Sequence, residues 1–347
     1  MSLKFWLVGG AFALVACKSE PPKTQPDAAA VIEEVAAPTP DAAAATPDAA
    51  AATPDTAAAT PDAVAPKAEA TVRLIEAGAD PKVAMRYSAA VGAEQTANLG
   101  MTTELELGAN GQKMPTALPK TKMTITAKVN AADPAADTTV GLVISEADIA
   151  EGQAAGGSRA AEKLAEVIRG MKGLKGDKVL SARGVSQRFT LAAPEGDSGI
   201  MGTAALKPVV QGFERAIDQM TVPFPDEAIG VGAKWEVTQQ VLEAGMTLDQ
   251  TIAFEVTAIK DNVVSLRFTV TLKAPPGKLE STFAGGMKAL VTSLEGGGEG
   301  TIEVDRSKVL PIAMSAKNKI VMALELDEQD TKRKLEVEMR VALEVTP

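Results

Sequence analysis

Very few side chains in this 347-residue chain could carry out catalysis. The chain contains no histidine and a single cysteine, Cys17. Ser-His-Asp and Cys-His systems need a histidine base, and zinc sites are usually built from histidine and cysteine. These classes are therefore excluded, and we expect no catalytic residue, no metal, no cofactor and no enzymatic activity.

Three further segments have compositions that resemble binding loops but lack the necessary spacing. Gly230-Val231-Gly232 lacks the third glycine of a dinucleotide loop, so we expect a tight turn before a core Trp235. The glycine run 296–300 is not followed by a phosphate-loop helix, and we expect it to connect a helix to a strand. The acidic segment 327–330 lacks the oxygen spacing and glycine of a calcium loop, which predicts a polar hairpin tip.

The N-terminus has the order of a secretory signal. Lys4 supplies a positive charge, and residues 5–15 are uncharged. This apolar run is shorter than the ~20 residues that span a bilayer. We therefore predict an export signal over residues 1–16.

The end of this signal, Leu14-Val15-Ala16-Cys17, resembles the bacterial lipobox. The resemblance implies diacylglyceryl transfer to the sulfur of Cys17, cleavage after Ala16 and acylation, as with palmitate, of the new amine. The protein would then be held on a membrane by lipid on Cys17. Lys18 follows the cysteine, which favours the outer membrane of the cell envelope.

Residues 17–68 are rich in Ala, Pro, Thr and Asp. A Thr-Pro-Asp triplet recurs every seven residues, with its prolines at Pro40, Pro47, Pro54 and Pro61. Proline at the repeated position excludes a coiled coil. We predict a disordered tether with a root-mean-square span of roughly 40 Å.

The body after residue 68 is acidic. The whole chain has a net charge of −10, and its first 68 residues contain four lysines and eight acidic residues, which leaves about −6 for the body. This charge gives no basis for binding nucleic acid. No cysteine follows Cys17, so a packed core must stabilise the fold, and we expect a monomer.

Alternating apolar and polar residues predict antiparallel strands through most of the body. The clearest are a strand at 99–107 before a turn at 110–111, a strand at 123–129, two strands at 251–258 and 263–272, and a long hairpin of 319–326 with 334–345.

Three segments have the 3–4 spacing of a helix, namely 158–171, 204–220 and 283–294. The predicted fold class is therefore α+β, with large antiparallel sheets and two or three helices packed on them. Both halves show two strands, a helix and a hairpin in the same order, which indicates an internal duplication. We place its halves at 69–220 and 221–347.

The segment 225–235 carries a further resemblance. Its pattern, with Pro225, Ile229, Gly230, Gly232, Ala233 and Trp235, resembles a signature in an uncharacterised family of β-rich bacterial secreted proteins and lipoproteins. The resemblance implies no activity.

The body is rich in methionine and poor in aromatic residues. Methionine fills cores, and it also suits grooves that bind varied apolar ligands. Two functions stay open: a binding or carrier module for an apolar small molecule, with a cavity of several hundred Å³, or a structural module that contacts another envelope protein through an exposed patch or strand edge.

Overall fold

The structure is a computed structural model that describes most of the body of the protein. The described residues are 70–109, 112–133, 137–150, 159–192, 213, 216–243, 246–274, 279–283, 287–328 and 331–347. The predicted signal at 1–16 with cleavage after Ala16, the lipidation site Cys17 and the tether at 17–68 lie outside the described residues.

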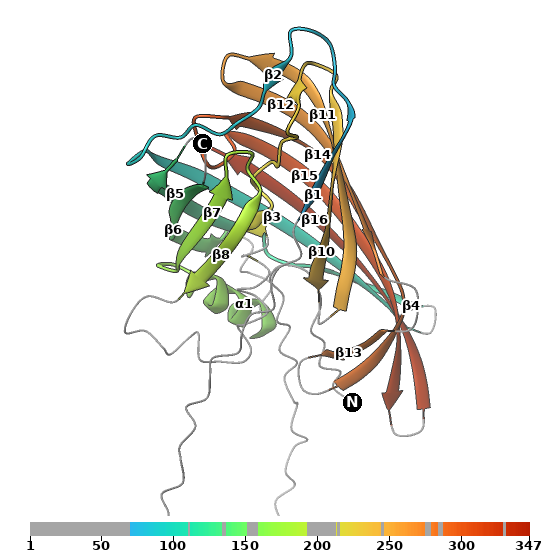
Figure 1. Ribbon diagram of the computed structural model, residues 1–347. Helices are drawn as coiled ribbons and strands as arrows, with labels where there is room; N and C mark the ends of the chain where they lie inside the picture. Colours follow the sequence, from blue (N-terminus) through green and yellow to red (C-terminus); the bar gives the residue numbers. More distant parts are fainter. Residues whose placement is uncertain are drawn as a thin grey trace, which may run out of the picture. The chain divides into compact units, whose positions relative to one another are not determined.

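Most of the described residues lie in antiparallel strands (Figure 1). In chain order the strands are β1 (Thr71–Glu76), β2 (Val83–Ala84), β3 (Glu94–Ala109), β4 (Gln112–Ala117), β5 (Thr121–Ala132), β6 (Asp137–Ile149), β7 (Lys175–Ser181), β8 (Ser186–Ala192), β9 (Ala228–Ile229), β10 (Lys234–Glu243), β11 (Met246–Lys260), β12 (Val263–Lys273), β13 (Leu279–Phe283), β14 (Met287–Asp305), β15 (Ala313–Glu328) and β16 (Thr331–Thr346).

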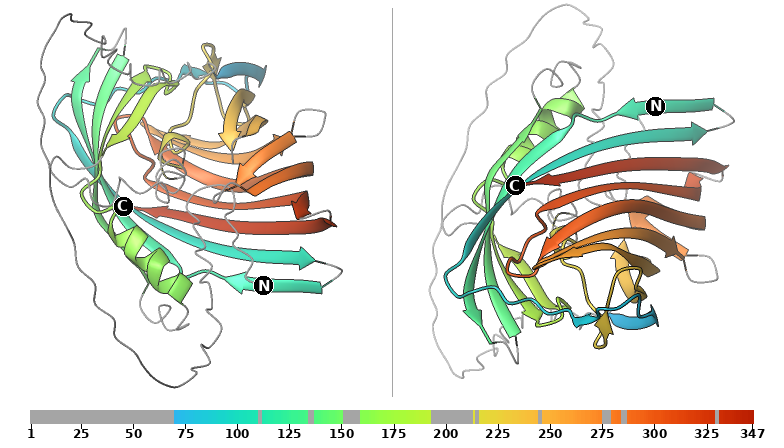
Figure 2. Two further views of the ribbon diagram at one scale, coloured as in Figure 1. Left: turned by 90° about the horizontal axis from the view of Figure 1, so that it is seen from below. Right: turned by 90° about the horizontal axis from the view of Figure 1, so that it is seen from above.

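One sheet contains almost all of these strands. Its order is β1-β10-β11-β12-β14-β15-β16-β3-β5-β6-β7-β8, while β4 pairs with β3 and β13 pairs with β14. Figure 2 shows the sheet curling, so that the β7–β8 end and the β10–β11 end approach each other. The curled sheet has one inward face, which holds the core.

The predicted α+β class is wrong, because the described residues are mostly β. The predicted helix at 158–171 is present as α1 (Arg159–Arg169), and its Ile168 is buried in the core. Of the predicted helix at 204–220, residues 213 and 216–218 are helical, and most of the remainder is not described. Among the described helices, none has the length and apolar character to cross a bilayer.

A helix was predicted at 283–294, but the described residues of this range belong to strands. Phe283 ends β13, and residues 287–294 begin β14. Register shifts between Val291 and Ser293 where β14 pairs with β15. Such a bulge adds one residue to a strand, so the next inward side chain comes three positions later. Val291 and Leu294, both buried, therefore have helix-like spacing within a strand.

The two predicted halves of the body contribute strands to the same sheet. β16 pairs with β3 from Leu335–Ala109 to Thr346–Asn98, and β1 pairs with β10. The shared element order that suggested a duplication fails at β14, where the second half has a strand in place of a helix. The boundary between 69–220 and 221–347 stays a prediction.

The strand hairpins predicted from alternation are confirmed. β11 and β12 pair around Asp261-Asn262, β15 pairs with β16 on both sides of 329–330, and β3 pairs with β4 on both sides of 110–111. Inward residues of the whole sheet, together with residues of α1, form three buried apolar clusters. One is centred on β5, β6 and α1, one on Trp235, and one on the far ends of β14 to β16.

A buried ion pair fixes the helical segment 216–218 to the sheet. Lys178 on β7 is 3.4 Å from Asp218, and the two side chains are 4% and 14% exposed. Lys178 Nζ also donates to the carbonyl of Asp218 at 2.9 Å and to Thr221 Oγ1 at 2.8 Å. A lysine at the end of a helical turn stabilises carbonyls that lack helical partners.

We predict that Lys178→Met lowers the free energy of unfolding by about 3–5 kcal/mol, because it leaves the Asp218 carboxylate buried without its cation. Adding Asp218→Asn to this variant should recover part of the loss. Urea unfolding followed by circular dichroism measures both effects.

The matched control is Lys175→Met, since Lys175 lies on the same strand with its side chain exposed. An exposed substitution of this kind should change the free energy of unfolding by less than about 0.5 kcal/mol. Equal losses for Lys178→Met and Lys175→Met would contradict a structural role for the buried pair.

Candidate functional site: an uncharged pocket on the inward face

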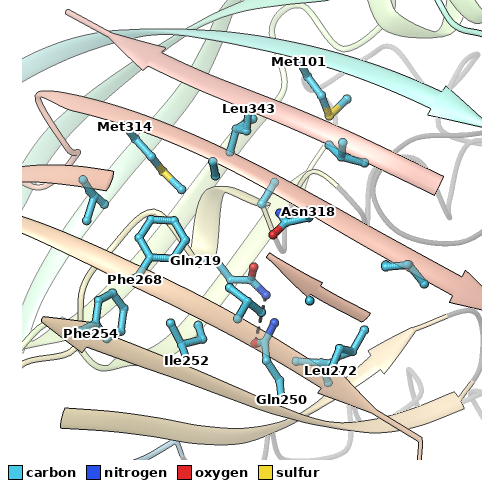
Figure 3. Close-up of a pocket in the computed structure, with 18 of the residues that line it drawn as sticks. Met101, Gln219, Gln250, Ile252, Phe254, Phe268, Leu272, Met314, Asn318 and Leu343 are labelled. Atoms are coloured by element: carbon cyan, nitrogen blue, oxygen red, sulfur yellow. Dashed lines mark hydrogen bonds between the residues drawn. The ribbon is translucent and has the colours of Figure 1, made fainter. Parts of the chain in front are cut away.

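A pocket of about 200 Å³ lies on the inward face of the sheet, between β11 and β16 and under the segment 216–222 (Figure 3). Paired residues of adjacent strands share a face, so rows of side chains cross it. From β11 to β16 the rows are Gln250, Leu272, Gly296, Ile320 and Met339; Ile252, Val270, Gly298, Asn318 and Val341; and Phe254, Phe268, Gly300, Ala316 and Leu343.

Each of these three rows has a glycine where it crosses β14. A Cβ atom on Gly298 would lie 1.8 Å from Asn318 Oδ1, and one on Gly300 would lie 2.5 Å from Phe268 Cζ. Asn318 and Phe268 therefore occupy space that a side chain on β14 would fill. Because β14 presents no side chain at three successive inward positions, side chains from the neighbouring strands β12 and β15 extend over it there.

The pocket wall is apolar apart from three amide side chains. Gln250 lies on β11, Asn318 on β15 and Gln219 on the segment that follows the helical turn. In the view of Figure 3 these amides form a row, with Phe268 and Leu272 on opposite sides of it. Gln250 Oε1 accepts hydrogen bonds from Gln239 Nε2 at 2.7 Å and from Gln219 Nε2 at 3.4 Å.

None of the described residues that line the pocket is ionisable. Groups with a shifted pKa lie elsewhere; for example, the hydrogen bond from Lys128 lowers the pKa of Glu94. Within the described part of the chain, no group of three His, Cys, Asp or Glu residues could hold a metal. The described lining thus offers apolar contact and neutral hydrogen bonds, and no acid or base.

A chain of aromatic rings runs from the pocket into the core. Phe268 contacts Phe254, which stacks on Trp235 with 5.3 Å between ring centroids. Phe224 and Tyr87 continue the chain. Trp235 is fully buried and donates from Nε1 to the carbonyl of Pro223 at 2.8 Å. Its predicted role as a core anchor is confirmed.

The Gly230-Val231-Gly232 segment forms the predicted turn before Trp235. Gly232 has a positive φ of 81°, which glycine adopts without strain. A Cβ on Gly230 would lie 1.8 Å from the carbonyl oxygen of Ala79, so glycine allows the two backbones to approach. This turn packs the segment that contains Ala79, just after β1, against the residues that precede β10.

The glycine run at 296–300 was predicted to connect a helix to a strand. This prediction is wrong, because the run lies within β14. Its alternation, Gly296-x-Gly298-x-Gly300, indicates a strand that lacks inward side chains at three positions, because period two places all three glycines on one face of a strand. Asn318 was also missed, since nothing local distinguishes it from other polar strand residues. The predicted role of methionine in the core is confirmed, for example by Met85 and Met123, while Met101, Met314 and Met339 line the pocket.

Comparison with known proteins finds similarity to a family whose function is unknown. Residues 210–311, which include β10–β12 and the glycines of β14, match the model of a family of unknown function (DUF6263). No curated protein matches the chain. A solved Bacteroides fragilis protein with a YmcC-like fold, described as exported, is 9% identical, with 74% of this chain and 98% of that chain covered. Its TM-score of 0.24 is too low to carry an argument.

The only tyrosine of the chain offers a test of the packing around the aromatic rings. Tyr87 is buried, and its hydroxyl donates to the carbonyl of Val222 at 3.3 Å and accepts from the Val222 amide at 3.2 Å. Burial raises the pKa of Tyr87 far above its usual 10.0, and the hydrogen bonding with Val222 opposes this only in part. The neutral phenol is therefore favoured by folding.

We predict that the contribution of the neutral Tyr87 phenol to the free energy of unfolding is complete below pH 10. As the pH rises above 10, the free energy of unfolding should fall by about 1.4 kcal/mol per pH unit. Tyr87→Phe should lack this dependence, although it is less stable at neutral pH. Denaturant unfolding at several alkaline pH values compares the two proteins. Near-ultraviolet absorbance of phenolate follows Tyr87 directly, and its titration near pH 10 in the folded protein would refute the prediction.

Proposed function

We propose that this protein is an envelope lipoprotein whose body binds the alkyl chain of a small amphiphile. The observation that carries this proposal is the uncharged pocket on the inward face of the sheet. Apolar side chains of seven adjacent strands, β10 to β3 in the sheet order, line it, and its described wall has no group that could act as an acid or a base. Binding is the chemistry that such a wall supports.

The size of the pocket favours one chain over several. At about 200 Å³ it lies below the several hundred Å³ that the sequence led us to expect, and below the ~300–1,000 Å³ of typical ligand sites. A dry apolar cavity of ~150 Å³ already binds benzene. A single medium-length alkyl chain therefore fits the space better than a lipid with two chains.

A lipid anchor would keep such a module beside its source of ligands. Leu14-Val15-Ala16-Cys17 supports this part of the proposal, as does the Pro-rich segment that follows. The tether would let the body reach roughly 40 Å from the membrane. The place of action would be the periplasmic side or the surface of the outer membrane.

A second candidate function is contact with another envelope protein through a strand edge. β1 and β8 stand at the two ends of the sheet order, and among the described residues each has a neighbouring strand on one side only. Such an edge can pair with an added strand. Protection of β1 amides from hydrogen exchange by a partner, together with failure to bind any alkyl chain, would favour this function over the first.

We predict that cells grown with labelled palmitate incorporate label into the wild-type protein and not into Cys17→Ser. The reason is that Cys17 is the only thiol in the chain. Gel electrophoresis of the immunoprecipitated protein measures the label. Ser19→Ala is the matched control and should be labelled like the wild type. Labelling of Cys17→Ser would show that the anchor is misassigned.

We predict that the processed chain, beginning at residue 17 and carrying Cys17→Ser, binds 1-alkanols with an affinity that rises with chain length. Each buried methylene contributes ~0.8 kcal/mol, or about fourfold in affinity, until the pocket is filled. Trp235 is the only tryptophan after residue 6 and stacks on a lining residue, so its fluorescence should report binding. Titration calorimetry provides an independent affinity.

Two substitutions on adjacent positions of β12 locate the binding site. Val270 lines the pocket, whereas Thr269 faces the opposite side of the sheet and is exposed. Val270→Phe should fill the pocket and weaken octanol binding at least tenfold, and Thr269→Phe should leave it unchanged. Equal effects of both substitutions, or no binding by the parent chain, would overturn the proposed function.

A further inference from the structure

The amide side chains of the pocket leave hydrogen-bonding groups free for a ligand. Both hydrogen bonds of Gln250 use its Oε1 atom, as acceptor from Gln219 and Gln239. The described residues provide no acceptor for Gln250 Nε2. Gln250 is only 7% exposed, so this amide is largely screened from bulk water.

Asn318 is a second incompletely paired amide. Its Oδ1 atom is buried over Gly298 and has no hydrogen-bond partner among the described residues. Leaving a buried acceptor unpaired destabilises a folded protein. Because Asn318 lines the pocket, rotation of its amide would present this oxygen to a ligand with a hydrogen-bond donor, and the new hydrogen bond would remove the cost, whereas an alkane would not.

The charge of the lining limits which polar group the pocket can accept. No described residue of the pocket wall carries a charge. An ionised head would leave water without a counter-charge to replace its hydration, which is strongly unfavourable. Amides carry both donors and acceptors without net charge, so they match a neutral hydroxyl or amide head.

We propose that the pocket selects amphiphiles with a single alkyl chain and an uncharged hydrogen-bonding head, a hydroxyl or an amide. This inference rests on the proposed function and adds the chemical class of its ligand. The chain lies against the apolar rows of β12, β15 and β16, and the head lies at the amides of Asn318, Gln250 and Gln219.

The test compares ligands that share an eight-carbon chain and differ in the head. Octanol and octanamide are neutral, octanoate and octyltrimethylammonium are charged, and octane has no head. The processed chain with Cys17→Ser should bind octanol and octanamide at least tenfold more tightly than either charged ligand, as measured by calorimetry and Trp235 fluorescence. The two charged ligands have opposite signs. The acidic body would repel octanoate but attract octyltrimethylammonium, so its charge cannot explain weak binding of both.

Substitutions of Asn318 separate recognition of the head from recognition of the chain. Asn318→Leu should weaken octanol binding about three- to tenfold, the usual effect of one lost hydrogen bond, and should leave octane binding unchanged or tighter. Asn318→Asp should strengthen binding of octyltrimethylammonium relative to the wild type. Gln240→Leu, which removes an exposed amide on β10, is the control and should alter neither.

The outcomes distinguish the two proposals. If none of the five ligands binds, the proposed function fails. If octane, octanol and the charged ligands bind with equal affinity, the pocket binds chains but the inference about the head is wrong. Preference for octanoate or for octyltrimethylammonium over octanol would also overturn it, as would an Asn318→Leu variant that retains the full preference for octanol.

Discussion

The pairing of β14 between β12 and β15 is the constraint on which the pocket and its surroundings depend. It is formed by backbone hydrogen bonds, so it tolerates glycine at Gly296, Gly298 and Gly300 although glycine disfavours isolated strands. The register then places these glycines in the same rows as the large side chains of β12. A shift by one residue would turn them outward, and Asn318 and Phe268 would lose the space that they occupy over β14.

Charged and neutral polar groups lie at different places on the inward face, and burying a charge costs more free energy than burying an amide. The charged pair of Lys178 and Asp218 lies at the end of the helical segment, where carbonyls and Thr221 accept hydrogen bonds from Lys178 and the Ser186 hydroxyl donates to Asp218. The pocket wall, in contrast, holds neutral amides among apolar residues. Asp218 directly precedes Gln219 in the chain, so the ion pair also positions one of those amides.

The aromatic chain connects this wall to the most buried part of the second cluster. Phe254 contacts both Phe268, at the pocket, and Trp235, whose turn is set by Gly230 and Gly232. The segment matched by the family of unknown function thus contains the turn, the aromatic anchor and the glycine strand together. A sheet built in this way provides an uncharged pocket on its inward face.

The sequence by itself determined the local elements and the chemistry that is absent. Period-two alternation identified hairpins such as β15–β16, and helical spacing located α1, because neighbouring residues decide which face of an element is apolar. The absence of histidine removed whole classes of active site. Only the tertiary structure decided that 287–294 is strand, since a bulge between Val291 and Ser293 imitates helical spacing and pairing with β15 overrides it. It alone brought Gly298 beneath Asn318, because these residues become neighbours only through the register of two long strands.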